Sequence, residues 1–242
     1  MALAGKRILV TRPAELAGGL AALIREAGGE PVLYPAIEIR DPEDPAAARA
    51  LLARLPEFEL AVFVSPSAVR KALELAPRGP WPRVAAVGEG TRRALEERGF
   101  RDVIAPAGGA DSEALLEVLA RPAMARWRSV LLLRGAGGRE LLGETLAARG
   151  ARVEVAECYR RVRPAAPPPA GRLDAICANS SEALENLATL LGRERLRQAA
   201  LFVSHARVAA RAAELGLREP VLAAPGDADM LAALVAYFGG AK

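Results

Sequence analysis

The stretch "AVFVSPSAVRKALE", from Ala61 to Glu74, begins with apolar residues typical of a strand, turns at Ser65 and continues with helical periodicity. The stretch "AICANSSEALENLA", which begins at Ala175, repeats this order, and Ser180 takes the place that Ser65 has 115 residues earlier. A serine at such a junction is typical of a helix N-cap. The recurrence predicts that the chain contains two copies of one strand–helix unit.

Three further blocks recur on either side of this junction, in the same order in both halves of the chain. They pair "KRILVTRPAELAGGLAALIREAGGEPVLY" with "RSVLLLRGAGGRELLGETLAARGARVEVA", "VAAVGEGTRRALEERGFR" with "LFVSHARVAARAAELGLR", and "DSEALLEVLA" with "DADMLAALVAYF". The helices of the first pair are expected to end at Gly28 and Gly150. Each half alternates strands and helices, which predicts two similar α/β domains with parallel sheets in flavodoxin-like layers, derived from an internal duplication.

The composition indicates a globular protein with an aliphatic core. The chain has 242 residues, of which 52% are hydrophobic and 4% aromatic, and this excludes a disordered chain. It carries 33 basic and 29 acidic side chains, a net charge of +4. The arginines are spread along the chain instead of forming a basic tail. Because guanidinium groups suit carboxylates and phosphates, an anionic small molecule explains this charge as well as a nucleic acid does.

The cysteines and the apolar runs give expectations about the compartment. Cys158 and Cys177 have no CxxC partner, so we expect buried thiols instead of a disulfide framework. The run "ILV" after Lys6 and Arg7 is too short for a signal peptide, and no apolar run approaches the roughly 18 residues that cross a bilayer. We therefore expect a cytoplasmic protein without a membrane or nucleic-acid partner.

The segments that follow the predicted strands are rich in Ser, Thr, Gly and Arg. They are "TRP" (11–13), "SPS" (65–67), "GEGT" (88–91), "RGAGGR" (134–139), "NSS" (179–181) and "SHAR" (204–207). In open α/β sheets, ligands bind beyond the carboxyl ends of the strands, where helix N-termini attract anions. Arg12, Arg134 and Arg139 lie there and are candidates either for carboxylate binding or for ion pairs within the protein. The run "RGAGGR" lacks the spacing of a nucleotide-binding loop.

These segments together resemble the uroporphyrinogen-III synthase family. The resemblance rests on "ILVTRP", the two serine junctions, "AAVGEGTRRALEERGF" and "LLLRGAGGRELLGETLAARGARVEVAECYRR", and it extends from about Lys6 to Leu234. The family fold implies two α/β domains joined by a two-stranded β ladder. Residues 1–37 and 165–242 would form one domain, residues 41–160 the other, and residues 38–40 and 161–164 the crossings. Proline-rich 163–171 would be a stiff connector.

The resemblance also implies the reaction. The substrate would be hydroxymethylbilane, a linear tetrapyrrole polycarboxylate, which is cyclised with loss of water and inversion of ring D to uroporphyrinogen III, in haem and other tetrapyrrole biosynthesis. Such a lyase would need no cofactor and no metal, because its main demand is to fold the bilane correctly. We expect helix N-termini in a cleft between the domains to bind the carboxylates. We further expect a monomer, with transient contact to the enzyme that supplies the substrate.

The resemblance assigns the general acid to Tyr159, in "CYRR"; the alternative is a tyrosine that covers the edge of a linker strand. A phenol has an ordinary pKa near 10, so it can donate a proton although it is a weak acid. The candidate substrate-binding residues near strand ends are, besides the three arginines, Ser65, Ser67, Thr91, Asn179 and Ser180. Ser65 and Ser180 are also expected to cap helices, and Thr91 has the alternative of a plain helix start.

Two other classes of protein remain open from the sequence. One is a non-enzymatic protein whose two lobes bind a small anion. The other is a two-domain glycosyltransferase that uses a nucleotide sugar, which would require a longer chain and either carboxylates or a pyrophosphate loop in the cleft. Formation of the type III isomer from hydroxymethylbilane separates the synthase hypothesis from both of these alternatives.

Overall fold

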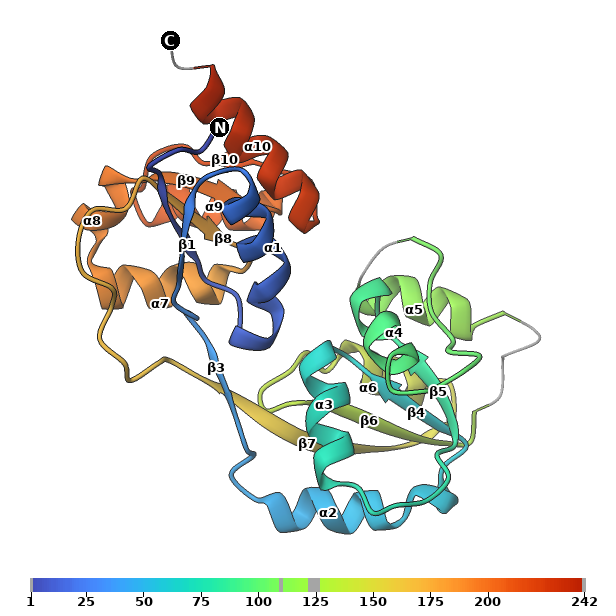
Figure 1. Cartoon of the computed structure of the whole chain (residues 1–242). Helices are drawn as coiled ribbons and strands as arrows, with labels where there is room; N and C mark the ends of the chain where they lie inside the picture. The colour runs from blue at the N-terminus through green and yellow to red at the C-terminus, as the bar shows by residue number, and fades with distance from the viewer. Residues whose placement is uncertain (1, 109–110, 122–126, 241–242) are drawn as a thin grey trace. The chain divides into compact units, whose positions relative to one another are not determined.

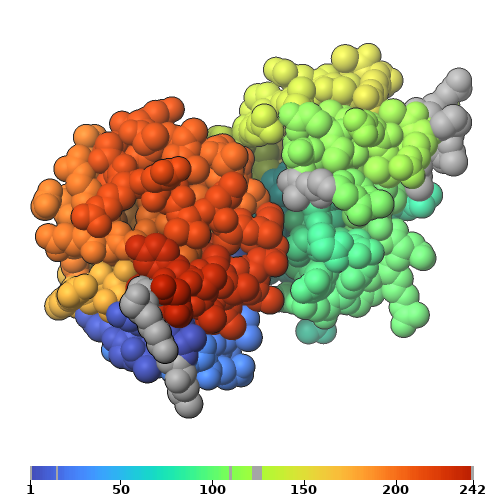
Figure 2. All heavy atoms as spheres, turned by 90° about the horizontal axis from the view of Figure 1, so that it is seen from above, coloured from blue at the N-terminus to red at the C-terminus, as the bar shows by residue number. Residues whose placement is uncertain are grey.

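The computed structural model describes residues 2–108, 111–121 and 127–240. The chain divides into two compact units, each with its own sheet. The terminal unit consists of Met1–Glu38 and Val162–Lys242, and the central unit consists of Ile39–Arg161. Figure 2 shows the two ends of the chain, blue and orange to red, within one body of atoms.

The terminal unit contains a five-stranded sheet in the order β10-β9-β8-β1-β2. Its strands are β1 (Arg7–Val10), β2 (Glu30–Leu33), β8 (Ala175–Ala178), β9 (Ala200–Val203) and β10 (Val221–Leu222). These neighbours pair in parallel, and Ile8 of β1 lies opposite Ala175 of β8. The strand β8 is buried along its whole length, as expected for a strand covered on both faces.

Helices cover both faces of this sheet (Figure 1). They are α1 (Ala14–Glu26), α7 (Ser181–Leu191), α8 (Arg193–Gln198), α9 (Ala206–Glu214) and α10 (Asp227–Gly239). Helices α1 and α10 pack together, and Leu20 and Leu234 enclose one apolar cluster with Ile8, Cys177 and Phe202 of the sheet. On the other face, helix α7 contacts both α8 and α9.

The central unit contains a second five-stranded sheet in the order β3-β7-β6-β4-β5. Its strands are β3 (Glu38–Arg40), β4 (Leu60–Phe63), β5 (Arg83–Ala86), β6 (Ser129–Gly135) and β7 (Arg152–Val162). The pairs β4–β5, β4–β6 and β6–β7 are parallel, and Ile104 forms an isolated parallel bridge with Ala85 of β5. Strands β3 and β7, in which the chain passes from one unit to the other, are neighbours in this sheet.

Helices enclose an apolar cluster on each face of the central sheet. They are α2 (Pro45–Ala53), α3 (Pro66–Leu75), α4 (Glu89–Glu96), α5 (Ser112–Leu119) and α6 (Leu141–Ala148), with a short 3-10 helix at Leu55–Glu57. The first cluster contains Leu52 of α2, Val69 of α3 and Leu95 of α4. The second contains Leu115 of α5 and Leu146 of α6.

The two sheets confirm the predicted fold class of two similar parallel α/β domains. When the central sheet is followed from its far edge, Ile104, β5, β4, β6 and β7 take the places of β10, β9, β8, β1 and β2. The predicted helix ends are also confirmed, because Gly28 and Gly150 follow α1 and α6 with φ of 88° and 92°. Glycine adopts this left-handed conformation at little cost.

The proline-rich segment that follows β7 is attached to the terminal unit by side chains. The Tyr34 hydroxyl donates to the carbonyl of Ala166 at 2.9 Å. The guanidinium of Arg7 donates to the carbonyl of Arg172 at 2.8 Å, and that of Arg195 donates to the carbonyl of Gly171 at 2.7 Å. The segment therefore follows the surface of the terminal unit.

Candidate functional site

The clearest arrangement of reactive side chains in the central unit joins Ser65 to Tyr159. Ser65 follows β4 and caps α3, where its Oγ accepts from the backbone N–H of Ala68 at 3.0 Å. The same Oγ lies 3.0 Å from the Tyr159 hydroxyl, and either oxygen can be the donor. Tyr159 is 4% exposed. The cap thus fixes a serine hydroxyl that in turn orients a buried phenol.

Ser67 and Thr91 lie in the first turns of α3 and α4. Both are buried, with exposures of 8% and 4%. Helix α4 begins after Gly88. Because glycine has no side chain, the N-cap position accepts no side-chain hydrogen bond from the first N–H groups of this helix. At Thr91 the structure therefore combines a buried hydroxyl with a helix start, and its substrate contact stays a prediction.

Arg134, at the end of β6, is bonded to the loop that follows it. Its Nη1 donates to the carbonyls of Gly138 and Arg139 at 3.1 and 3.2 Å, and its Nη2 donates to Glu140 at 2.7 Å. The hydrogen bond from Arg134 lowers the pKa of the Glu140 carboxyl. The Arg134 Nε is buried without a hydrogen-bond partner among the described residues. In this conformation the guanidinium stabilises the loop 136–140.

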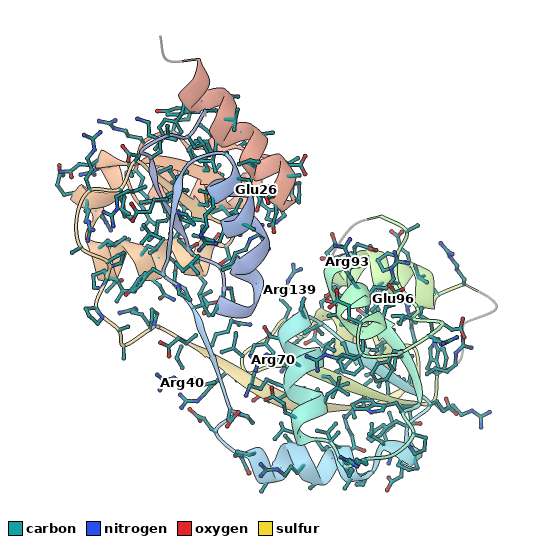
Figure 3. All side chains as sticks on the ribbon, in the orientation of Figure 1. Glu26, Arg40, Arg70, Arg93, Glu96 and Arg139 are labelled. Carbon is teal, nitrogen blue, oxygen red and sulfur yellow. The ribbon has the colours of Figure 1, made fainter. Side chains whose placement is uncertain are left out.

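Arg139 has a different environment from Arg134 although both belong to the run "RGAGGR". Its side chain is 69% exposed and projects from the loop between β6 and α6 (Figure 3). Its Nη1 lies 3.6 Å from a carboxylate oxygen of Glu113. An exposed pair of this kind contributes little to stability, so Arg139 can exchange its partner for another anion at low cost.

In the terminal unit, a chain of polar contacts crosses the carboxyl ends of three strands. Arg12, after β1, donates from Nε to Oδ1 of Asn179 at 3.2 Å, and Nδ2 of Asn179 donates to Oγ of Ser204 at 3.0 Å. Another nitrogen of Arg12 bonds and pairs with Asp227 at the start of α10. Ser180 caps α7 by accepting from the N–H of Ala183 at 3.1 Å. Arg12, Asn179 and Ser180 are thus brought to one edge.

The candidates named from the sequence did not include Asp227 or Ser204, although Ser204 lies in the predicted strand-end segment 204–207. The signal for Asp227 was its place in the first turn of a helix after Gly226, where acidic residues are favoured. The predicted N-caps at Ser65 and Ser180 are confirmed. The predicted burial of Cys158 and Cys177 is also confirmed, and burial raises the pKa of each thiol to about 12.

Across 2–108, 111–121 and 127–240, no three His, Cys, Asp or Glu side chains gather as a metal site would require. Within the same ranges, each helix is either too short or too polar to span a bilayer.

Taken together, the molecule is a duplicated two-unit α/β protein that presents hydroxyl and guanidinium groups where its strands end. Solved structures share this fold, among them the following two. A uroporphyrinogen-III synthetase from Helicobacter pylori has a TM-score of 0.63 at 17% identity, over 98% of this chain and 99% of that one. A mutant uroporphyrinogen III synthase from Thermus thermophilus has a TM-score of 0.59 at 21% identity, over 94% and 96%.

Sequence comparison gives the family. The model of the family described as Uroporphyrinogen-III synthase HemD matches residues 19–233. The Uroporphyrinogen-III synthase of Escherichia coli is 33% identical over 240 residues, which cover 93% of this chain and 97% of that protein. The Uroporphyrinogen-III synthase of Salmonella typhimurium is 38% identical over 159 residues, 64% of each chain. The chain belongs to the uroporphyrinogen-III synthase family.

Proposed function

We propose that this chain catalyses the reaction for which its family is named, the cyclisation of hydroxymethylbilane to uroporphyrinogen III with loss of one water. The single observation that carries this proposal is the family match over residues 19–233. The Ser65–Tyr159 pair in the central unit supports it further, because it offers an oriented proton donor. The alternative of a non-enzymatic anion-binding protein is not favoured by the relatives, which are named as synthases.

The proposed chemistry begins at the hydroxymethyl group. Protonation lets its oxygen leave as water, and the electrons of the adjacent pyrrole nitrogen stabilise the resulting cation as an azafulvenium ion, the protonated form of an azafulvene. The substituted carbon of ring D then attacks this centre to form a spiro intermediate. Fragmentation and reclosure reverse ring D, and loss of a proton restores the aromatic pyrrole. The electrons balance without an oxidant or reductant.

Tyr159 is the proposed donor of the first proton. Its hydroxyl is held at 3.0 Å from Ser65 Oγ, while the N–H of Ala68 fixes that same oxygen. A donor with so few orientations loses little entropy when the leaving hydroxyl arrives. Positioned general-acid catalysis typically contributes about 10²- to 10⁴-fold. Tyr159 is therefore proposed to accelerate the reaction, with the remaining acceleration supplied by binding the bilane in a reactive conformation.

The proposed groups that bind the substrate carboxylates are arginines and helix starts. They are Arg12, Asn179 and Ser180 in the terminal unit, and Ser65, Ser67, Thr91, Arg134 and Arg139 in the central unit. Ser180 already accepts a hydrogen bond as a cap, so it would offer its hydroxyl proton to a carboxylate. Ser65 would donate its one proton to the Tyr159 oxygen when the phenol donates to the leaving hydroxyl, so its share in carboxylate binding would come from the helix start that it caps. Arg139 is the most exposed of the three arginines.

Function without a cofactor, a monomeric state, a cytoplasmic location and transient contact with the preceding enzyme of the pathway stay predictions. Binding of the substrate by this chain alone would be consistent with function without a cofactor and with a monomeric state. Equilibrium sedimentation over a range of protein concentrations measures the oligomeric state directly.

The test of the proposed function uses freshly made hydroxymethylbilane and separates the isomers of the product after oxidation to porphyrin. Without catalysis the bilane closes to the type I isomer, so an active chain is expected to give predominantly type III. Heat-denatured protein is the control. Type I alone, at the rate seen with denatured protein, would contradict the proposed function.

A further inference from the structure

Tyr159 lies on a face of β7 that regular alternation would not give it. In a strand, successive side chains point to opposite faces. Val153 and Val155 pack against the cluster beneath α5 and α6, whereas Ala156 and Cys158 belong to the cluster beneath α2 and α3. Alternation would place residue 159 with Val155. Tyr159 instead belongs to the same cluster as Cys158.

A shift in the pairing of β6 and β7 explains this position. Arg134 lies opposite Glu157, but the next residue of β6, Gly135, lies opposite Tyr159. Cys158 is the extra residue, and the shift has the character of a β-bulge. A bulge re-aims the side chains that follow it. Pairing resumes at once, because the N–H of Ala136 donates to the carbonyl of Tyr159 at 2.8 Å.

The re-aimed ring occupies the space where a side chain at position 135 would begin. A Cβ atom at Gly135 would lie 2.6 Å from Cε2 and Cζ of Tyr159, and 3.1 Å from its hydroxyl oxygen. Carbon atoms attract each other only at about 3.5–4.0 Å, so any residue other than glycine must displace the ring or the strand. The ring is therefore held at its face by Gly135 and at its hydroxyl by Ser65.

We propose that Gly135, together with the bulge at Cys158, is the positioning device of the catalytic tyrosine. Gly135 is a positioning residue, since it would act on the reaction only through the place and tilt of the Tyr159 ring. This inference rests on the proposed role of Tyr159. A displacement of about 1 Å in a reacting group can cost roughly 10²-fold in rate, and the overlap at Gly135 demands a shift of that order.

The test compares Gly135→Ala with Gly143→Ala. A Cβ at Gly143, in α6, would meet only Leu132 Cδ1 at 3.3 Å and Val153 Cγ1 at 3.9 Å, and both residues belong to the apolar cluster on the opposite face of the sheet from the Tyr159 cluster. The position of the ring is followed by NMR of protein labelled with ¹³C in its three tyrosine rings. The Tyr159 signal is identified by its absence from Tyr159→Phe. Gly135→Ala is expected to move that signal alone, and Gly143→Ala to move none of the three.

Activity is measured on the same proteins and on a double variant. Gly135→Ala is expected to form type III at least about tenfold more slowly than wild type, while Gly143→Ala keeps the wild-type rate. In the Tyr159→Ala background the ring is absent, so adding Gly135→Ala is expected to have no further effect. This non-additivity identifies action through the ring, which a general weakening of the strand would not produce.

The inference is overturned if Gly135→Ala leaves the Tyr159 signal unmoved or keeps the wild-type rate. It is also overturned if Gly135→Ala lowers the rate by the same factor in the wild-type and the Tyr159→Ala backgrounds. If Gly135→Ala does not fold, a folded double variant with the rate of Tyr159→Ala still supports a clash with the ring. A double variant that also fails to fold overturns it. Formation of type I alone by wild type is a different outcome, because it rejects the proposed function itself, and with it the catalytic meaning of Gly135.

Discussion

The two units share one frame but carry different groups at corresponding places. Val10 pairs with Cys177 in the terminal unit, and Leu132 pairs with Val62 in the central unit. Cys177 and Val62 correspond, because each lies three residues before the serine that caps the next helix. Arg12 and Arg134, each two residues after Val10 or Leu132, are therefore equivalent residues. The arginine of the terminal unit reaches Asn179 and Asp227 on other elements. The arginine of the central unit donates its hydrogen bonds to its own loop, and its contact with another element is the 3.7 Å ion pair with Glu157 of β7. Duplication therefore kept the sheet and the caps, while the contacts at the strand ends diverged.

The largest difference between the two units is Tyr159 of the central unit, and its replacement tests the comparison most directly. Tyr159→Phe is expected to slow formation of type III by about 10²-fold or more, because the proton donor is lost while the ring still fills its space. The measurement is the initial rate of type III formation. Tyr34→Phe is the control in the terminal unit, since its hydroxyl bonds only the carbonyl of Ala166 among the contacts described. Equal rates for Tyr159→Phe and wild type would remove Tyr159 from the mechanism.

The two arginines should differ in their effect on stability. Arg134→Met is expected to lower the free energy of unfolding by about 2 kcal/mol, because several hydrogen bonds from a buried cation are lost. Arg12→Met is expected to cost about 1 kcal/mol, since its side chain is more exposed and solvent screens its ion pair. Urea unfolding measures both. A larger loss for Arg12→Met would reverse this ranking of the two strand ends.

The two capping serines should differ in both stability and kinetics. Ser180→Ala removes one cap bond to a backbone N–H and is expected to cost about 1 kcal/mol of unfolding free energy. Ser65→Ala removes such a bond and also the partner of the buried Tyr159 hydroxyl, so it is expected to cost about 2 kcal/mol. Ser65→Ala also frees the Tyr159 hydroxyl and should lower kcat. Ser180→Ala lacks that connection and should act on KM. Equal kcat values for the two variants would show that the Ser65–Tyr159 bond does not matter for catalysis.

The smallest predicted effect is the pH dependence of stability that comes from one buried thiol in each unit, and here the two units should behave alike. Burial raises the pKa of Cys158 and of Cys177 to about 12, against an ordinary value of 9.0. The folded state keeps its thiol protons while the unfolded state loses them, so stability is full below pH 9 and falls as the pH rises toward 12. At pH 9.5 the loss should be about 1 kcal/mol or less per thiol. Cys158→Ala and Cys177→Ala should each remove an equal share of this slope, measured by urea unfolding at several pH values.

The sequence was sufficient for the elements whose causes are local. The order of strands and helices, the caps at Ser65 and Ser180 and the glycine ends at Gly28 and Gly150 all follow from residues within a few positions of each other. The repeat then implied the sheets. The reaction and the general-acid role of Tyr159 were predicted from the resemblance to the family, and not from periodicity.

The sequence was not sufficient where two distant segments must be in register. The bulge at Cys158 depends on how β7 pairs with β6, and the overlap of Gly135 with the Tyr159 ring follows from that pairing. The bonding of Arg134 to its own loop depends on a turn whose conformation no motif specifies. The roles of the candidate substrate-binding residues stay predictions until a bound tetrapyrrole or kinetic data test them.

The pairing of β1 with β8 has a consequence for the order in which the molecule is made. Ile8 of β1 lies opposite Ala175 of β8, so the chain of the central unit emerges from the ribosome between two neighbouring strands of the other sheet. Because domains fold as units during synthesis, the continuous segment Ile39–Arg161 can fold first. The first two strands and α1 must wait for β8 to pair with β1, so the apolar edge of β1 stays uncovered until the second half of the chain has been made.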